Sequence, residues 1–443
     1  MQNQGIRDAR SLGTPKLLVL GLQHMFAMFG ATVLVPALTG LSVSATLLFA
    51  GLGTLFFLFV TKGKVPAFLG SSFAYLAGYA AIAPNGEAAL LPYACVGVAA
   101  SGLLYLILAA LVRGFGANRV MRFFPPVVTG PIIICIGMTL ANSAINNCTG
   151  SWDIALVAIL TVVIFNIWGK GMLRIIPILL GVLVSYVYAA VTGRVDFSGV
   201  ASAAWIGLPV KMENTVFSLI GNCDANLLVT AIIAIMPIAF ATMIEHIGDI
   251  CAISSTVGAN FIADPGLHRT LLGDGLATSI ASLFGAPANT TYGENTGVLA
   301  LTRVYDPLVI RLAAVYAIIA SFCPKFAALV SAMPTGTIGG VSLILYGMIS
   351  AIGVRNLVEN RVDLAKSRNV IVVSLIISLA LGITFSAAGA ITFHVGEFTL
   401  NFSGLAVAAI VGIVVNAILP GKDYNFQNDY EYGKTTEDHG QML

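Results

Sequence analysis

Charged residues are scarce in this 443-residue chain: Asp, Glu, Lys and Arg make up 9% of it, whereas 58% of the residues are hydrophobic. Soluble globular proteins contain about 25% charged residues, so this composition excludes a water-soluble fold, and its hydrophobicity excludes a disordered chain. The few charges also balance, with 22 Lys and Arg against 20 Asp and Glu, which removes any electrostatic reason to expect nucleic acid as a partner. The composition indicates a protein that lies in the lipid bilayer.

The chain also lacks the residue spacings that hold metals and phosphorylated cofactors. Its six cysteines form no CxxC or zinc-type pattern, and neither an HExxH sequence nor a phosphate-cradling glycine motif is present. We therefore expect no metal and no cofactor, apart from a coupling ion. Cys148 and Cys223 both fall in predicted outer loops, where they either form a disulfide bond or remain unpaired thiols.

Glycine and proline are abundant, with 46 and 17 residues, which bundled membrane helices tolerate through close packing and local breaks. A span of about 20 residues with its loop takes roughly 30 residues, so the chain has room for about fourteen spans. The sequence predicts an all-α polytopic membrane protein. The predicted spans lie at 16–38, 43–61, 66–81, 88–112, 125–141, 153–168, 174–193, 225–252, 268–285, 287–301, 308–330, 337–353, 369–388 and 403–420.

Lys and Arg gather in alternate loops between these spans. If the N-terminus is inside, 19 of the 22 lie on the inner side, and only Arg194, Lys211 and Lys325 lie on the outer side. Because Lys and Arg accumulate in cytoplasmic loops, the segment 1–15 and the tail 421–443 are both predicted to be cytoplasmic. The first apolar run follows a polar segment and lacks a cleavage site, which predicts a retained first span in a multi-pass protein of the cytoplasmic membrane.

The two halves of the chain resemble each other weakly at an offset of 221 residues, which aligns Pro66 with Pro287 and His24 with Glu245. Each proline begins a segment rich in Gly, Ser, Thr and Asn, at 68–73 and 289–295, which favours a short extended strand over a helix. Seven spans in each half make the halves an inverted repeat, whose broken spans 3 and 10 would meet at a ligand site near the midplane. Two packing kinks without a ligand are the alternative.

Ionisable groups inside spans are costly and therefore indicate function. Glu245 and Asp249 in the eighth span are four residues apart and share one helical face. Two buried carboxylates repel each other when both are ionised, so one of them should hold a proton and act as a proton carrier. Glu294 and Asn295 lie in the extended part of the tenth span, and His24 in the first. A structural role, in which hydroxyl groups satisfy the carboxylates, is the alternative.

Three further ionisable residues are predicted to lie outside this cluster. His246 is rotated by about 100° from Glu245 around the helix, which favours a structural role. Asp274 and His268 fall near the inner surface, where solvated or loop-capping roles are expected.

Four motifs are long and uncommon: LQHMFAMFGAT at 22–32, GSSFA at 70–74, DPGLHR at 264–269 and NTTYGEN at 289–295. They resemble the bacterial uracil permeases of the nucleobase–cation symporter (nucleobase-ascorbate transporter) family, and the likeness runs from about residue 12 to about 420. The resemblance implies fourteen spans in a seven-plus-seven inverted repeat, short strands in spans 3 and 10, and a homodimer. It also implies a core domain at 16–112 and 225–334 and a gate domain at 113–224 and 335–420.

The resemblance further implies roles for single residues. Glu245 and Glu294 would hydrogen-bond a nucleobase, and Phe73 and Tyr292 would flank its ring. His24 would support the site. Backbone amides at Ala31, Phe73 and Gly293 would serve the ring carbonyls, and Asp249 and Asn295 would join His24 in supporting the site and its coupling.

One residue departs from the pattern of the uracil permeases, which have a second histidine where this chain has Asp249. Relatives that carry purines share Glu-x-x-Gly-Asp with this chain, but they have Gln-Asn-x-Gly where it has Glu294-Asn295-Thr296-Gly297. The tenth-span side chain should meet the ring directly, which favours uracil. The role of Asp249 in coupling stays open.

These residues predict a secondary transporter that takes up uracil together with a proton by alternating access, with Na⁺ as an open alternative for the coupling ion. A xanthine or urate permease of the same family is the alternative within the class. A passive channel is a further alternative. No nucleophile or metal set converges on Glu245, so an enzyme is not expected.

Overall fold

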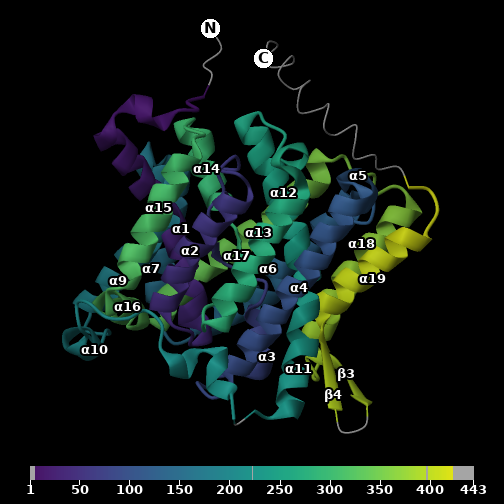
Figure 1. Cartoon of the computed structure of the whole chain (residues 1–443). Helices are drawn as coiled ribbons and strands as arrows, with labels where there is room; N and C mark the ends of the chain where they lie inside the picture. The colour runs from purple at the N-terminus through teal and green to yellow at the C-terminus, as the bar shows by residue number, and fades with distance from the viewer. Residues whose placement is uncertain (1–4, 222, 396–397, 423–443) are drawn as a thin grey trace.

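The structure is a computed structural model that describes residues 5–221, 223–395 and 398–422, and most of these residues are helical (Figure 1). The helices are α1 (Thr14–Thr39), α2 (Val43–Val60), α3 (Leu76–Ile82), α4 (Leu91–Phe115), α5 (Ala117–Met121), α6 (Pro126–Cys148), α7 (Trp152–Trp168), α8 (Met172–Ile175), α9 (Pro177–Val191), α10 (Ser198–Ser202), α11 (Ala225–Ile235), α12 (Ala239–Val257), α13 (Leu267–Leu283), α14 (Gly293–Thr302), α15 (Pro307–Ser321), α16 (Pro324–Ser331), α17 (Thr335–Glu359), α18 (Ser367–Thr384) and α19 (Gly404–Ile418). The strands are β1 (Leu69–Ser71), β2 (Asn289–Thr291), β3 (Ala390–Val395) and β4 (Phe398–Ser403). Short irregular turns are η1 (Ala9–Leu12), η2 (Met212–Asn214), η3 (Val216–Leu219), η4 (Met236–Ile238) and η5 (Ile262–Gly266).

Each predicted span overlaps an observed helix or a strand followed by a helix. Among the described residues, seven helical segments are long and apolar enough to cross a membrane, and α15 and α16 form a further pair bent by 87°. The helices α7, α9 and α19 are apolar but shorter. The all-helical membrane fold is therefore confirmed, whereas the count of fourteen spans and the inverted repeat stay predictions with which this arrangement agrees.

The helix ends follow local sequence signals. The side chain of Ser42 accepts a hydrogen bond from the amide of Ala45 and begins α2, and Asp306 does the same for α15, which has proline in its first turn. Gly40 ends α1 in the left-handed conformation, at φ +80°.

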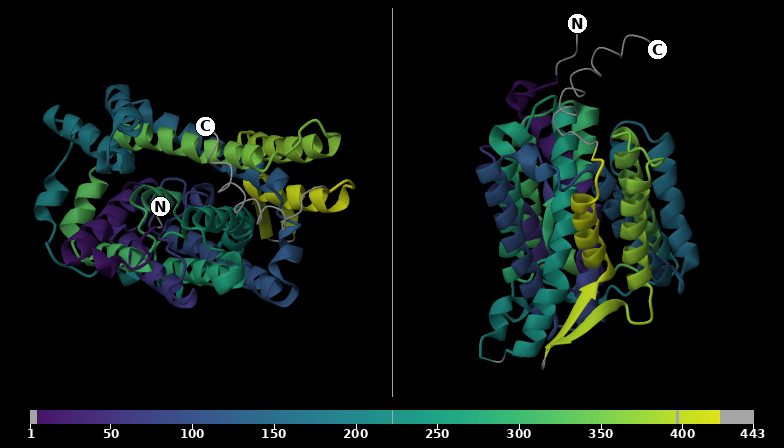
Figure 2. Two further views of the ribbon diagram at one scale, coloured as in Figure 1. Left: turned by 90° about the horizontal axis from the view of Figure 1, so that it is seen from above. Right: turned by 90° about the vertical axis from the view of Figure 1, so that its right-hand side faces the viewer.

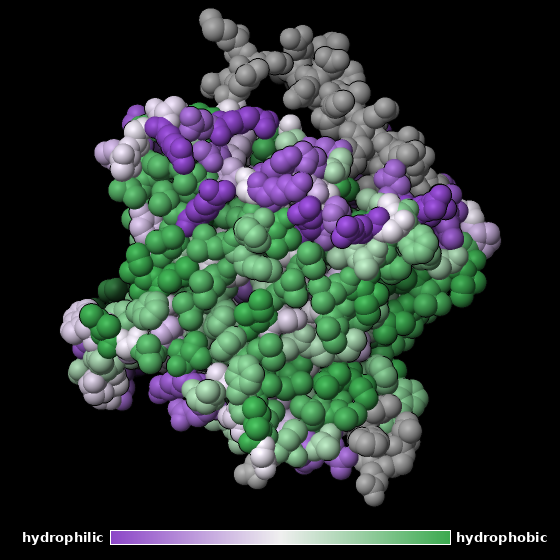
Figure 3. Space-filling model, viewed as in Figure 1, coloured by the Kyte–Doolittle hydropathy of each residue, from purple (hydrophilic) through white to green (hydrophobic). Residues whose placement is uncertain are grey.

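A hydrophobic surface covers the middle of the molecule, and hydrophilic residues gather toward its upper and lower ends (Figure 3). That pattern is the one that a bilayer requires.

The helices pack in two groups, which lie side by side when the molecule is seen from above (Figure 2). In one group, α13 packs against α4 and α2, and α15 packs against α2 and α1. In the other group, α17 packs against α6, α7 and α9, and α18 packs against α6 and α19. The groups contain helices from the predicted core and gate segments respectively, but their roles as moving domains stay a prediction.

The strands β1 and β2 come from opposite halves of the chain and pair antiparallel in the middle of the molecule, with Gly70 opposite Thr290. Short strands in spans 3 and 10 are thereby confirmed. The expectation that Glu294 and Asn295 lie in the extended part of span 10 is wrong, because β2 ends at Thr291 and both residues lie in the first turn of α14. Their outer edges are satisfied by neighbouring helices: the Thr54 hydroxyl of α2 accepts from the Leu69 amide at 2.8 Å, and the Thr278 hydroxyl of α13 donates to the Asn289 carbonyl at 2.8 Å. Extended backbone is stable at this depth because protein groups replace water.

Two features differ from the sequence predictions. The strands β3 and β4 form an antiparallel hairpin that packs against α11, whereas this stretch was expected to be a connection between spans. Cys148 is buried as the last residue of α6, and both Cys148 and Cys223 are free thiols. Of the two alternatives for these cysteines, the structure therefore shows the unpaired thiols. The loop position expected for Cys148 is wrong, because α6 continues past its expected end and its last turn packs against α17, where a Cβ on Gly339 would lie 2.7 Å from the Cys148 sulfur.

The first helix begins and the last helix ends at the same face of the molecule (Figure 1). The described part of the segment 1–15 packs there: the Ile6 amide donates to the Arg303 carbonyl at 2.8 Å, and the Ala9 amide donates to Asp306 at 2.9 Å. The predicted tail 421–443 lies outside the described residues, except for Gly421 and Lys422.

Candidate functional site

The helix α12 carries three of the predicted ionisable residues on two faces. Glu245 and Asp249 share the side turned toward β2 and α14, whereas His246 is buried on another side. The Nδ1 atom of His246 lies 3.1 Å from a carboxylate oxygen of Asp274 in α13, and both side chains are completely buried. The prediction that His246 faces away from Glu245 is consistent with this position.

The position of Asp274 differs from the prediction, which placed this residue near the inner surface with a solvated or capping role. It lies seven residues into α13, about 10 Å from the helix start at 1.5 Å per residue, and is completely buried beside His246. The predicted start of the span at residue 268 was right to within one residue. The prediction was wrong because it took no account of how deep Asp274 lies along α13. His268, in the first turn of the same helix, is half-buried, as its position at the helix end predicts.

Asp249 is held by the strand β2. The hydroxyl of Thr291 donates to the Asp249 carboxylate at 2.7 Å and also lies 3.5 Å from Nδ1 of His246. A satisfying hydroxyl is what the structural alternative for the carboxylates requires, so the structure supports that alternative for Asp249.

Glu245 and Glu294 are half-buried, and among the described residues no other residue donates a hydrogen bond to either carboxylate. Glu245 lies within electrostatic range of Asp249, Asp274 and Glu294. The two glutamates thus come from different halves of the chain but belong to one acidic cluster. Their free oxygens are available to an incoming donor.

His24 and Asn295 join α1 to α14. The Nδ2 atom of Asn295 donates to the His24 carbonyl at 3.1 Å and lies 3.2 Å from its Nδ1. Both residues are buried. Within the described chain, Nε2 of His24 and Oδ1 of Asn295 have no hydrogen-bond partner, so the pair retains polar capacity that a ligand or water would use.

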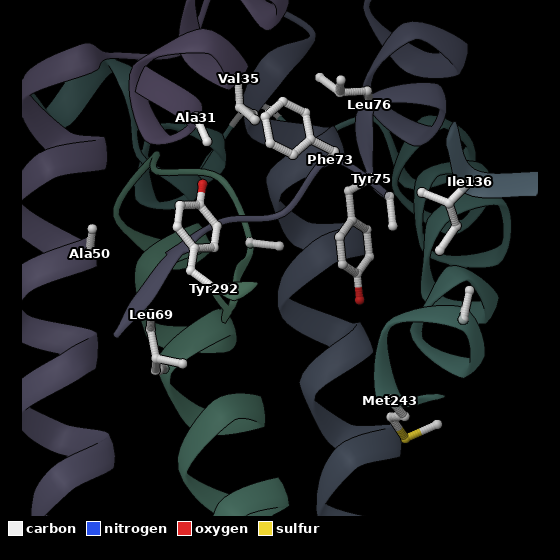
Figure 4. Close-up of a cluster of buried hydrophobic side chains, with 14 of the residues drawn as sticks. Ala31, Val35, Ala50, Leu69, Phe73, Tyr75, Leu76, Ile136, Met243 and Tyr292 are labelled. Atoms are coloured by element: carbon white, nitrogen blue, oxygen red, sulfur yellow. The ribbon is translucent and has the colours of Figure 1, made fainter. Parts of the chain in front are cut away.

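Tyr292 is engaged with β1. Its hydroxyl donates to the Ser71 carbonyl at 2.8 Å, and the Ser71 hydroxyl donates to the Thr32 carbonyl of α1 at 2.9 Å. The ring lies over Gly70, where an added Cβ would be 2.5 Å from it. Figure 4 shows this ring below Ala31 with its hydroxyl directed upward. The hydrogen bonds of Ser71 and Thr32 were not predicted from the sequence. The glycine at position 70 was a signal that another group approaches the backbone of this extended segment closely.

Phe73 faces the other helical group. Its ring meets that of Tyr346 in α17 edge to face, with centroids 5.8 Å apart. Tyr346 is buried, and its hydroxyl and that of Ser342 have no partner within the described residues. The sequence analysis missed both, although their i, i+4 spacing in the predicted span 337–353 places two hydroxyls on one helical face.

Two of the three predicted backbone donors are free. No acceptor in the described part of the chain receives the amide of Phe73 or that of Gly293. The residue before α14 provides no side-chain cap, so the Gly293 amide lies unsatisfied at the positive dipole end of the helix. Nothing lies within 4 Å of a Cβ built on Gly293 or Gly248. The third expected donor, Ala31, lies inside the continuous helix α1, where an amide bonds to the carbonyl four residues earlier.

These groups form a site with complementary chemistry. It offers carboxylate oxygens that accept hydrogen bonds, amides that donate them, and open space beside Gly293 and Gly248. Such a set suits a small polar ring that has both donors and acceptors on its rim. The convergent carboxylates and amides would fix the orientation of that ring.

The chain is similar to known permeases over most of its length. The model of the Permease family matches residues 15–389. The chain is 42% identical to the uracil permease of Bacillus caldolyticus, with 96% of each chain covered. It is 40% identical to the uracil permease of Bacillus subtilis, with 99% of this chain and 98% of that protein covered. It is 38% identical to the uracil permease of Escherichia coli K12, with 90% of each covered.

Solved structures show the same fold at low identity. The transmembrane domain of the cyanobacterial bicarbonate transporter BicA aligns with a TM-score of 0.62 at 13% identity, covering 94% of this chain and all of that one. The anion transporter SLC26A9 aligns with a TM-score of 0.64 at 12% identity, covering 93% of this chain and 66% of that one. Sequence and fold agree, and the chain belongs to the permease family that includes the bacterial uracil permeases.

Proposed function

We propose that this protein carries uracil across the cytoplasmic membrane of a bacterium, together with a proton, by alternating access. The observation that carries the proposal is a set of two carboxylates, on Glu245 and Glu294, that accept no hydrogen bond from any other described residue, together with two amides, on Phe73 and Gly293, that no described acceptor receives. Uracil presents two N–H donors and two carbonyl acceptors on a small neutral ring. Each group on its rim therefore has a complementary partner in the site.

The polar set also supports selectivity. A ligand that leaves one buried polar group unpaired loses about 1–3 kcal/mol for each such group. Phe73 and Tyr292 would add flat walls that gain dispersion energy without charge. His24 and Asn295 would hold α14 in place behind the ring through their hydrogen bonds.

Proton coupling follows from the cost of unpaired charge. An ionised carboxylate that is carried through a low-dielectric region without a partner is strongly unfavourable. In the proposed cycle, Glu245 is protonated when uracil binds and gives up its proton when uracil is released inside. Asp249 is held by Thr291 and acts as a positioning residue. Na⁺ in place of H⁺ is an outcome that the uptake experiment distinguishes.

The cycle requires the two helical groups to move relative to each other. The core domain (16–112 and 225–334) would hold the site, the gate domain (113–224 and 335–420) would expose it alternately to each side, and two chains would form a homodimer. Both termini would be cytoplasmic, as the Lys and Arg distribution indicates. Crosslinking of intact cells and accessibility of terminal tags in spheroplasts test the dimer and the orientation.

Uptake in proteoliposomes tests the coupling. Labelled uracil should accumulate when an inward proton gradient is imposed without Na⁺, and a protonophore should abolish the accumulation. Glu245→Gln keeps the side-chain volume but cannot exchange a proton, so accumulation should be lost. The matched control is Glu213→Gln, an exposed residue that lies beside Lys211 in η2. Full accumulation by the Glu245 variant would refute the coupling, and so would wild-type accumulation that the protonophore does not reduce.

A xanthine or urate permease is the second candidate, and Asp249 is the observation that favours it, since purine carriers share Glu-x-x-Gly-Asp. Competition of labelled uracil uptake by unlabelled uracil, xanthine and urate decides between them. Uracil should compete at the lowest concentration. Equilibration without accumulation would instead indicate a passive channel.

A further inference from the structure

A cavity of about 400 Å³ lies apart from the site described above, between the end of α2 and the first turns of α15. It opens at the face where α1 begins and α19 ends. Its lining combines two cations with three apolar side chains and one glycine. The lining residues are Leu55, Leu58, Phe59, Lys62, Gly63 and Arg311.

The two cations lack an acidic partner. Lys62 and Arg311 are exposed, and within the described residues neither forms an ion pair. Their neighbour Lys64, by contrast, pairs with Asp264. Two like charges at one cavity repel each other unless an anion lies between them.

The backbone makes room for one of these charges. Gly63 has a φ of +62°, and a Cβ at this position would lie 2.6 Å from Nη2 of Arg311. The guanidinium therefore lies against the bare glycine backbone. A planar guanidinium held this way can bind two oxygens of one phosphate group.

The apolar part of the cavity continues along the lipid-facing surface. Phe59 is 81% exposed, and Leu52, two turns earlier in α2, is 42% exposed. On α15, Val315 and Ile319 are also exposed, at 40% and 63%. Both helices thus present apolar side chains that lead from the cations toward the middle of the membrane. A soluble anion would use only the cationic end of this surface.

We propose that this cavity binds an anionic glycerophospholipid, with its phosphate between Lys62 and Arg311 and an acyl chain along α2 and α15. Basic pockets between membrane helices suit such head groups. The contact would join α2 to α15, two helices of the group that carries the acidic site. This proposal does not depend on the identity of the transported molecule.

Lipid titration of the purified full-length protein in detergent tests the proposal. Short-chain phosphatidylglycerol, short-chain phosphatidylcholine and inorganic phosphate are added separately, and the bound lipid is counted by native mass spectrometry. Phosphatidylglycerol should bind more tightly than phosphatidylcholine, and phosphate alone should neither bind nor displace it. Each Lys or Arg near an anionic lipid surface contributes about fivefold in affinity, so Lys62→Gln with Arg311→Gln should weaken binding about 30-fold.

Matched variants separate this site from general lipid attraction. Arg113→Gln removes an exposed cation in the last turn of α4 that does not line the cavity, and it should leave the affinity unchanged. Lys62→Arg with Arg311→Lys keeps both charges and should retain most of the binding. A size-exclusion profile and a Tm that match those of wild type verify the fold of every variant. Equal binding of phosphatidylglycerol and phosphatidylcholine, equal binding to wild type and the double Gln variant, or full displacement by phosphate would overturn the proposal.

Discussion

Replacing Glu294 by Gln tests the proposed contact with the ring most directly. The substitution keeps the length and volume of the side chain but removes its charge and turns one of its two oxygens into an amide donor. Among the described residues, the only donor to this carboxylate is the backbone amide of Glu294 itself, and the remaining side-chain oxygen of Gln can still accept that bond. The side chain follows directly after the free amide of Gly293 at the start of α14, so a change in affinity would report on the ligand contact itself.

The expected magnitude follows from the kind of hydrogen bond that is lost. A bond between a neutral N–H and a carboxylate contributes about 1.5–3 kcal/mol, whereas a bond to the neutral oxygen that Gln retains contributes about 0.5–1.5 kcal/mol. The difference of about 1–1.5 kcal/mol corresponds to a Kd for uracil about 5- to 12-fold weaker. Isothermal titration calorimetry on purified protein measures this change, with Glu213→Gln as the control. Size-exclusion chromatography and the thermal unfolding midpoint should match those of wild type. An affinity within twofold of wild type would refute the contact.

Two further predictions concern the packing behind the site. Asp274→Ala leaves His246 buried without its neighbour and should lower the free energy of unfolding by about 1–3 kcal/mol, whereas replacing both by Leu should cost much less. Equal losses in denaturant unfolding would contradict the pairing. Gly70→Ala forces a Cβ to 2.5 Å from the Tyr292 ring and should cost about 1–3 kcal/mol. Gly114→Ala, with nothing within 4 Å, is the control, and an equal shift in Tm for both variants would exclude this contact.

The strand pair at the centre could be predicted because its signals are local. The segments that contain Gly70 and Thr290 are too polar for a lipid-facing helix, and proline precedes each of them. Backbone at that depth must be satisfied by protein or by water in a cavity. This requirement alone indicates that two such segments should meet, which they do.

Other parts depend on packing that the sequence does not display. Asp274 was predicted near the inner surface because its distance from the end of the span was ignored. Its neighbour His246 lies in a different span, so the contact between them has no local signal in the sequence. The contact between Phe73 and Tyr346 joins residues more than 270 positions apart, and no pattern in either segment indicates the other. The β3–β4 hairpin, in contrast, has a local signal that was overlooked, since residues 390–403 are rich in Thr, Phe, Ile and Val around a Gly-Glu pair.

The four acidic residues near the site fall into two classes, and this division limits what the ligand can be. Asp274 is completely buried and lies 3.1 Å from Nδ1 of His246, although without a hydrogen bond of ordinary geometry, and Asp249 accepts a hydrogen bond from Thr291, so both are directed at groups of the protein. Glu245 and Glu294 have no donor from another described residue. Because a buried acceptor without a donor is costly, a ligand must bring a donor or a proton for each of them. A neutral ring with two N–H groups can donate to both side chains at once, with Glu245 protonated as in the proposed cycle, whereas an anionic ligand would add charge to a cluster that is already acidic.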